Sequence, residues 1–426
     1  MTEMTWPSQP FGELYAEPSR NGLTRPKRVR GAGVKMVNMG ELFAFSRLNG
    51  QEMDRVPVTE SEAASFGLRA GDLLFARQSL IASGAGKCSI VLAVPEPTTF
   101  ESHLIRVRLD PAKADPHYFY YYLSSPDGKG RVQSLVMQVA AAGIRGSELA
   151  RLPVPIPPTE VQRRIASVLK AYDDLIENNT QRIVVLEEMT RLLYGEWFVN
   201  YRFPGHEGVE MVDSSFGPVP SGWSVMNLSQ LVTTQYGYTE SASTDVVGPK
   251  FLRGMDINKN SYIEWDSVPY CPIGERERDR YRLSKGDIVV IRMADPGKVG
   301  IVETDVDAVF ASYLIRLSIT SSLVRPHYLF YFLLSERYQD YVTGASTGTT
   351  RKSASAGVMT AIDVALPPEP LMNRFEEVIG DIRMALNALL GKNSVLRRTR
   401  DLLLPRLISG ELGVSNLDIN TRELSA

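Results

Sequence analysis

The sequence has 426 residues, of which 43% are hydrophobic and 23% charged, so it holds enough apolar material for two or three globular domains and is not a disordered chain. Its net charge of -2 argues against general binding of polyanions but allows a local basic surface. The two cysteines, Cys88 and Cys271, exclude a disulfide framework and a multi-cysteine zinc site. No stretch approaches the ~20 apolar residues of a membrane span, and the N-terminus has no apolar signal segment. We therefore expect a protein of the reducing cytoplasm that does not enter a membrane.

The N-terminal region contains the densest run of one charge sign. Between Glu17 and Glu41 there is no acidic residue. The same interval contains six basic residues, which are Arg20, Arg25, Lys27, Arg28, Arg30 and Lys35. A solvated protein surface normally mixes both signs, so this run is a candidate binding surface for an anion.

The chain is built from two copies of one unit. The segment Ser-His-Leu-Ile-Arg at 102–106 recurs as Ser-Tyr-Leu-Ile-Arg at 312–316, which is 210 positions later. The aromatic run at 116–121 recurs at 326–331 with the same offset. An internal repeat fixes the architecture before any motif is interpreted, so we expect two domains of similar fold.

Each unit is expected to begin as a β-rich domain. The run Leu-Leu-Phe at 73–75 follows a Gly-Asp turn, and the run 288–291 follows an equivalent turn 215 positions after the first. Short apolar runs that follow such turns are typical of buried strands. The change of offset from 215 to 210 indicates small insertions in loops.

Each unit is expected to end in a long helix that follows a Pro-Pro pair, at 157–158 and 367–368. Apolar positions then recur at alternating steps of three and four, with Asn179 on the first stripe. The first stripe comprises Ile165, Leu169, Tyr172, Ile176, Ile183, Leu186 and Leu193, and the second comprises Phe375, Ile379, Ile382, Leu386, Leu389, Leu396 and Leu403. This spacing predicts an antiparallel coiled coil, roughly 60 Å long at about 1.5 Å per residue. The alternative is that each helix packs only on its own domain.

Together these motifs resemble those of type I restriction-modification specificity subunits, the HsdS family, over nearly the whole chain. The resemblance rests on the two strand motifs, the two Leu-Ile-Arg segments, and the Pro-Ile-Pro-Pro-Thr-Glu-Val-Gln-Arg-Arg-Ile entry to the first helix at 155–165. The opening of the second unit, with Pro-Ser-Gly-Trp at 220–223 and Leu-Ser-Gln-Leu at 228–231, is also similar. Departures occur at Val161, where the family often has Glu, and in the second helix entry at 370–375.

The resemblance implies an α+β fold with two target-recognition domains, 1–155 and 205–365, two helical spacers, 156–204 and 366–412, and a tail at 413–426. It implies a non-catalytic subunit that directs two modification subunits to an asymmetric double-stranded DNA sequence in two parts. Each domain would read one part, and the helices would set the gap. Restriction subunits would add ATP-driven translocation and cleavage. S-adenosylmethionine, ATP and Mg²⁺ would all bind partner subunits, so neither a catalytic residue nor a metal site is expected here.

Phosphate contacts require Lys or Arg, and base reading requires long polar side chains that reach the groove edges. In the first domain the candidates are the six basic residues between Glu17 and Glu41 together with Arg77, Gln78 and Lys87. In the second domain they are Tyr236, Tyr238, Lys250, Arg253, Arg292, Lys298, Arg351 and Lys352. For any single one of these residues, solvation of a loop is the competing interpretation.

Two rival functions fit the sequence less well, which are an enzyme that methylates or cuts DNA and a coiled-coil adaptor. The triplet Asp127-Gly128-Lys129 follows Pro126 and is interpreted as a turn and not as a nuclease site. An adenine methyltransferase would need an Asn/Asp-Pro-Pro-aromatic motif, which the sequence lacks, and the segment 83–87 fails as a phosphate-binding loop because Ile81 and Cys88 replace required residues. A coiled-coil adaptor without DNA specificity is the second rival, against which the basic run argues. His117 and His327 recur ahead of the helices and are interpreted as packing corners and not as metal ligands.

Overall fold

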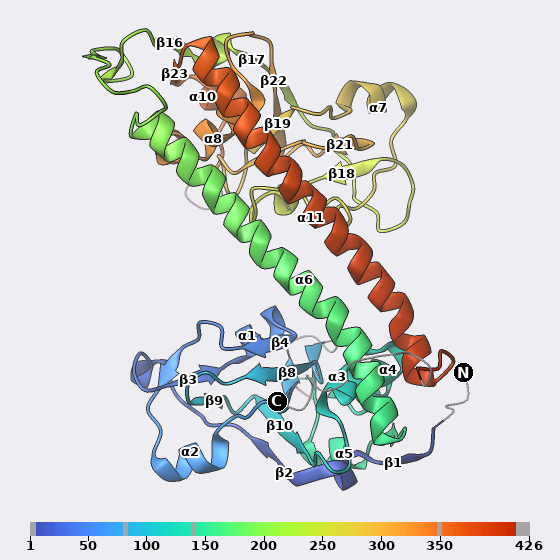
Figure 1. The fold of residues 1–426 in the computed structure, drawn as a ribbon. Helices are drawn as coiled ribbons and strands as arrows, with labels where there is room; N and C mark the ends of the chain where they lie inside the picture. The colour runs from blue at the N-terminus through green and yellow to red at the C-terminus, as the bar shows by residue number, and fades with distance from the viewer. Residues whose placement is uncertain (1–5, 80–83, 139–141, 347–351, 415–426) are drawn as a thin grey trace. The chain divides into compact units, whose positions relative to one another are not determined.

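The computed structural model describes residues 6–79, 84–138, 142–346 and 352–414, and the chain divides into two compact units (Figure 1). Unit 1 comprises residues 1–176 and 395–426, and unit 2 comprises residues 177–394. Each unit contains one β-rich domain, called domain 1 and domain 2 below. Each also contains part of both long helices, α6 (Thr159–Tyr194) and α11 (Glu369–Ser409). The expected α+β class, with a long helix after each β-rich domain, is confirmed.

Domain 1 is organised around a five-stranded sheet. Its strand order is β2 (Tyr15–Asn21), β10 (Leu104–Leu109), β6 (Leu73–Ala76), β8 (Cys88–Ala93) and β4 (Arg47–Asn49). A three-stranded sheet contains β5 (Arg55–Val56), β3 (Val34–Val37) and β9 (Thr98–Phe100). Smaller sheets join β11 (Met137–Gln138), β12 (Ala142–Gly143) and β7 (Gln78–Ser79), and pair β1 (Ser8–Pro10) with β13 (Pro153–Pro155). The short helices are α1 (Met39–Ala44), α2 (Glu60–Phe66), α3 (Pro116–Ser124), α4 (Pro126–Ser134) and α5 (Gly146–Arg151).

Domain 2 repeats this plan. Its main sheet has the order β17 (Val232–Tyr236), β22 (Leu314–Ile319), β19 (Ile288–Ile291) and β20 (Val299–Ile301). The two-stranded sheets pair β16 (Ser224–Asn227) with β23 (Asp363–Leu366), β18 (Lys250–Leu252) with β21 (Ala308–Phe310), and β14 (Met211–Val212) with β15 (Val219–Pro220). Its short helices are α7 (Glu275–Tyr281), α8 (Pro326–Leu334), α9 (Glu336–Ala345) and α10 (Ala356–Thr360).

The strand register shows that the repeats in the sequence are repeats in space. Ile105 of β10 lies opposite Phe75 of β6, and their counterparts Ile315 and Val290 lie opposite each other in domain 2. The aromatic runs form equivalent helices, α3 and α8, and both begin with Pro at the first helical position, where its missing N–H costs nothing. Six consecutive residues of each helix are buried, so the aromatic runs form domain core.

The core clusters show which surfaces cover the apolar stripes of α6 and α11. Ile165 and Leu169 of α6 lie in the core cluster of domain 1, whereas Phe375 and Ile379 of α11 lie in that of domain 2. These four residues were expected in the seam between the helices. That expectation needs correction, because a stripe with a period near 3.6 predicts a buried face but not the surface that covers it. The first turns of each helix therefore pack on the preceding domain.

The opposite end of each helix packs on the other domain core. Leu404, Leu407 and Ile408 of α11 belong to the core cluster of domain 1. Tyr194 at the end of α6, with Trp197 in the following helical turn, belongs to that of domain 2. Both cores thus contain residues from both long helices.

Between these ends, the helices pair directly within unit 2. Ile183, Leu386 and Leu389 form a buried cluster, with Leu186 packed against it. Asn179 and Asn393 are buried beside this cluster, and Asn179 Nδ2 donates to Asn393 Oδ1 at 2.9 Å. Because higher numbers in α6 meet lower numbers in α11, the pairing is antiparallel. The remaining positions of both predicted stripes, Tyr172, Ile176, Leu193, Ile382, Leu396 and Leu403, are half-buried.

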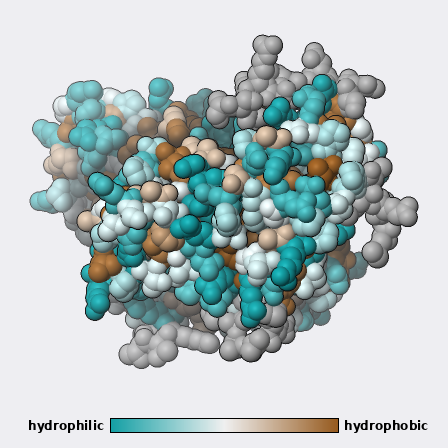
Figure 2. Space-filling model, turned by 90° about the horizontal axis from the view of Figure 1, so that it is seen from below, coloured by the Kyte–Doolittle hydropathy of each residue, from teal (hydrophilic) through white to brown (hydrophobic). Residues whose placement is uncertain are grey.

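Among the described helices, none combines the length and apolar character needed to cross a membrane. The face drawn in Figure 2 is largely teal and white, with smaller brown hydrophobic areas between hydrophilic residues.

Candidate nucleic-acid interface

In domain 1, an arginine at the end of β6 is fixed between two neighbouring segments. The backbone N–H of Arg77 donates to the carbonyl of His103 at 2.8 Å, and its own carbonyl accepts from Ile144 N at 2.9 Å. The guanidinium donates to the carbonyl of Ser102 at 3.4 Å, which is a long contact. Next along the chain, Gln78 Oε1 lies 3.2 Å from His103 Nδ1, and both side chains are exposed. The strand end therefore presents polar side chains from a rigid backbone.

Domain 2 has the same construction at the end of β19. Arg292 N donates to the carbonyl of Tyr313 at 2.9 Å, and the carbonyl of Arg292 accepts from Ala354 N at 3.0 Å. Ala294 follows with φ +72°, a left-handed conformation that is strained for a residue with a Cβ. Its N–H donates to the carbonyl of Lys352 at 3.0 Å, which holds the loop in place. We call this edge the strand-end platform. In domain 1 it comprises Arg77, Gln78 and His103, and in domain 2 it comprises Arg292, Tyr313 and the loop that follows Arg292, with Lys298 and Lys352.

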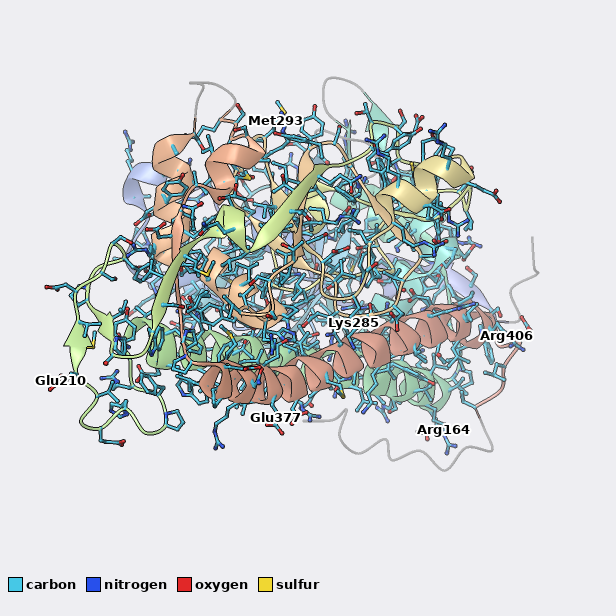
Figure 3. All side chains as sticks on the ribbon, turned by 90° about the horizontal axis from the view of Figure 1, so that it is seen from above. Arg164, Glu210, Lys285, Met293, Glu377 and Arg406 are labelled. Atoms are coloured by element: carbon cyan, nitrogen blue, oxygen red, sulfur yellow. The ribbon has the colours of Figure 1, made fainter. Side chains whose placement is uncertain are left out.

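The platform of domain 2 carries aromatic rings. The guanidinium carbon of Arg292 lies 4.8 Å from the ring centroid of Tyr236, and the Tyr236 hydroxyl accepts from Ala356 N at 3.1 Å. Tyr313, the counterpart of His103, is 52% exposed. Tyr313 and His103 were not among the residues predicted to contact DNA, although both directly precede the repeated Leu-Ile-Arg segment, which was a usable signal. Met293 of this loop lies at the edge of domain 2 away from Glu377 of α11 (Figure 3).

Half of the basic N-terminal run is neutralised by acids from later segments. Arg25 forms a 2.6 Å ion pair with Glu62, and Arg30 forms one of 2.6 Å with Asp54. Lys35 is 4% exposed, and its ammonium donates to two backbone carbonyls and pairs with Glu96 at 3.1 Å. The ammonium of Lys35 serves the fold and is not available to a phosphate, which corrects its selection as a DNA contact.

The other half of the run remains exposed. Lys27 and Arg28 lie in a short 3-10 turn, and no carboxylate among the described residues lies within ion-pair distance of either. Arg20 is exposed and its guanidinium lies 5.2 Å from the ring centroid of Phe66. These three residues keep the charge that a phosphate contact needs.

Lys87 lies in the β6–β8 hairpin of domain 1 beside an exposed ring. Its ammonium donates to the carbonyl of Phe43 at 2.7 Å and lies 5.1 Å from that ring centroid. Burial and the nearby charge of Lys129 lower the pKa of Lys87.

The remaining candidates of domain 2 fall into side chains that are engaged within the protein and side chains that are exposed. Lys250 donates to the carbonyl of Val268 at 2.7 Å, Arg253 pairs with Asp256 at 2.9 Å, and Tyr238 packs against the ring of Tyr281. Lys298 and Lys352 are exposed. Arg351 lies outside the described residues.

Sequence reasoning missed a buried charged network where domain 2 meets α11. His327 Nε2 lies 3.0 Å from Glu303 Oε1, and its Nδ1 lies 2.9 Å from Glu376 Oε1. Arg383, 1% exposed, donates to both oxygens of Glu303. Burial opposes charge on His327, but both carboxylates outweigh it and raise its pKa to about 9. Burial also opposes charge on Glu303, yet bonds from His327 and Arg383 lower its pKa to about 2.

This network is structural. Within the described residues, no group of His, Cys, Asp and Glu side chains is arranged to hold a metal ion. Burial lowers the pKa of the counterpart of His327, His117, which forms no ion pair with a carboxylate within the part of the chain that the structure describes. The equivalent polar contact of domain 1 is instead made by Asp173 of α6, which accepts from Tyr121 at 2.7 Å and pairs with Arg400 of α11.

Comparison with known proteins gives a consistent result. Residues 51–188 match the family model described as "Type I restriction modification DNA specificity domain". The MjaIX type I restriction enzyme specificity subunit of Methanocaldococcus jannaschii is 25% identical over 312 residues, which are 70% of this chain and 70% of that protein. The EcoBI specificity subunit of Escherichia coli is 22% identical over 309 residues, 68% of this chain and 63% of that protein.

A solved structure shares the fold. The type I restriction-modification S subunit from M. genitalium superposes with a TM-score of 0.58 at 14% identity, covering 96% of this chain and 97% of that one.

Proposed function

Because the chain belongs to the family of type I restriction-modification specificity subunits, we propose that each of its two β-rich domains reads one half of a two-part, asymmetric DNA sequence. The chain is the DNA specificity subunit of such a system and is non-catalytic. On this proposal it directs two modification subunits, which bind S-adenosylmethionine. Restriction subunits would bring ATP-dependent and Mg²⁺-dependent activity.

The observation that carries the proposal is the repeated strand-end platform. Each domain holds one arginine at the end of an equivalent strand. Arg77 is hydrogen-bonded to the segments of His103 and Ile144, and Arg292 to the equivalent segments of Tyr313 and Ala354. Long polar side chains on a rigid backbone are what base reading requires, and nearby lysines supply phosphate contacts. Two such platforms in one chain support two separate reading events.

The test is a domain exchange. Residues 1–155 are replaced by the equivalent domain of a relative, and the hybrid is expressed with its modification subunits and its target determined by methylome sequencing. One half of the target should change and the other should persist. Because Leu404, Leu407 and Ile408 pack in the core of domain 1, the exchange should also carry the relative's equivalents of these three residues. A folded, methylating hybrid with both halves altered would contradict independent reading.

We further propose that the helix pair sets the gap between the half-sites. The antiparallel seam supports this role, because an added heptad in each helix preserves its phase. Seven residues inserted after Asn179 and seven beside Asn393 lengthen the pair by about 10 Å, which matches roughly 3 base pairs. Methylome sequencing should show a wider gap between unchanged half-sites. Four residues inserted in only one helix should impair assembly.

The same helices offer a surface for the modification subunits. Val185, Met189 and Leu192 follow a 4-3 spacing on α6, and all three are about half exposed. A groove of about 560 Å³ between the helices is lined by Val185, Ala385 and Ala388. Exposed apolar side chains in such a stripe favour a helical partner. Met189→Lys with Leu192→Lys should abolish co-purification of modification subunits, whereas Val246→Lys, at a loop valine that is 78% exposed, should not.

A further inference from the structure

Arg292 is fixed in position by hydrogen bonds of its backbone and by an aromatic ring. Backbone hydrogen bonds fix it on both sides, to Tyr313 and to Ala354. Its guanidinium lies over the ring of Tyr236, and the Tyr236 hydroxyl is itself anchored by Ala356 N. The strained backbone of Ala294 comes two residues later. Strain of this kind persists where the surrounding structure enforces it, and it is concentrated at binding sites.

The charge of Arg292 has no carboxylate partner among the described residues. Three arginines of domain 2, Arg253, Arg278 and Arg383, are each matched by a carboxylate, of Asp256, Asp307 and Glu303 respectively. The Nε atom of Arg292 is buried without an acceptor in the structure. A buried donor without a partner costs free energy, so the fold accepts a cost to hold this side chain in place, while the half-buried guanidinium keeps its charge for an acceptor that a ligand brings.

We propose that Arg292, supported by Tyr236, reads a guanine in the half-site recognised by domain 2; this rests on the proposed function. A guanidinium held in one plane presents two parallel N–H donors, and guanine O6 and N7 are the pair of acceptors in the major groove that they match. The exposed lysines of the same platform, Lys298 and Lys352, suit the flanking phosphates. Lysine at position 292 would give a point charge without the two-donor geometry.

In domain 1, Arg77 is not supported by a ring in the way that Tyr236 supports Arg292. The residue opposite Ile105 in the sheet is Asn21, whereas the residue opposite its counterpart Ile315 is Tyr236. Arg77 therefore has no ring beneath it at that register position, and its guanidinium contacts the carbonyl of Ser102. The inference is thus specific to the second half-site.

The experiment uses the complete complex with its modification subunits. Arg292→Gln and Arg292→Lys are compared with the wild type by methylome sequencing. Arg280→Gln is the matched control, because Arg280 also lies over a tyrosine ring, that of Tyr281 at 5.5 Å, but on helix α7. The Arg292 variants should accept other bases at one guanine position of one half-site, losing about 5- to 150-fold of discrimination there. The Arg280 variant should keep the wild-type target.

Binding to synthetic duplexes separates base reading from a folding role. Replacing that guanine by 7-deazaguanine removes the N7 acceptor and should weaken wild-type binding, while an Arg292→Gln complex should bind both duplexes equally. Tyr236→Phe should retain most discrimination, because the ring remains, and Tyr236→Ala should not.

Three results would overturn the inference: a domain 2 half-site without guanine, an unchanged target in the Arg292 variants, or wild-type binding that ignores 7-deazaguanine throughout that half-site. A wild-type complex that methylates no two-part sequence would instead refute the proposed function.

Discussion

The ion-paired His327 predicts a pH dependence of stability that one substitution should remove. His327 lies between Glu303 and Glu376, which raise its pKa from 6.5 to about 9. Each pKa unit is equivalent to about 1.36 kcal/mol, so charging His327 in the folded state contributes about 3 kcal/mol. The histidine is mostly buried, so solvent screens this interaction little.

The direction follows from the raised pKa. A group that binds its proton more tightly when folded stabilises the fold fully below its unfolded pKa, here 6.5, and the contribution is lost as the pH rises through about 9. Glu303 behaves oppositely, since its pKa is lowered to about 2, and its contribution is lost as the pH falls from 4.5 towards 2. The network should therefore stabilise domain 2 most between pH 4.5 and 6.5.

The assay is urea unfolding of the full chain at pH 6.0 and pH 9.5, followed by tryptophan fluorescence. Three of the four tryptophans, Trp197, Trp223 and Trp265, lie in unit 2, so the signal reports mainly on that unit. The free energy of unfolding of the wild type should fall by about 3 kcal/mol more between these pH values than that of His327→Gln. His206→Gln, in the same unit, is the control and should behave as the wild type. Equal pH dependence in wild type and His327→Gln would refute the reasoning.

Three further outcomes are expected. Lys27→Ala with Arg28→Ala should lower the slope of log affinity against log salt by about 0.9 for each lost phosphate contact, and an unchanged slope in DNA titrations would mean that both merely solvate a turn. Asn393→Leu alone should cost about 1–3 kcal/mol in unfolding experiments because it leaves the Asn179 amide unpaired, whereas the double change to leucine should recover most of that loss. Leu407→Ala should destabilise domain 1 by about 2–5 kcal/mol, measured by thermal unfolding; no effect would contradict its place in that core.

The repeat was the most informative feature of the sequence. Matching residues 102–106 with 312–316 predicted two equivalent domains, and the strands formed by these residues occupy equivalent places in their sheets. Local periodicity predicted both long helices because it depends on neighbours within one helix. It could not predict that Ile165 and Phe375 pack on domain cores, since the period of a stripe carries no information about the covering surface.

The candidate interface was predicted less completely. The run between Glu17 and Glu41 has no acid within it, yet Glu62 and Glu96 return to it through the fold. Such ion pairs depend on tertiary structure and leave no local pattern. The same applies to Tyr236, whose ring supports Arg292 only because β17 and β19 flank the same strand, β22.

The place of the α11 terminus in domain 1 has a consequence for synthesis on the ribosome. Trp6 near the beginning of the chain donates its indole N–H to the carbonyl of Ile408 at 3.1 Å, and Leu407 fills part of the same core. About 250 residues separate the end of domain 1 at Pro158 from Ile408, which at 5–20 residues per second is roughly 12 to 50 s of translation. Throughout this interval the nascent N-terminal domain exposes an apolar surface that only the last part of the chain can cover. A premature stop after domain 2 would leave that surface open permanently, so truncated products should be targets for chaperones and proteases even though both β-rich domains are complete.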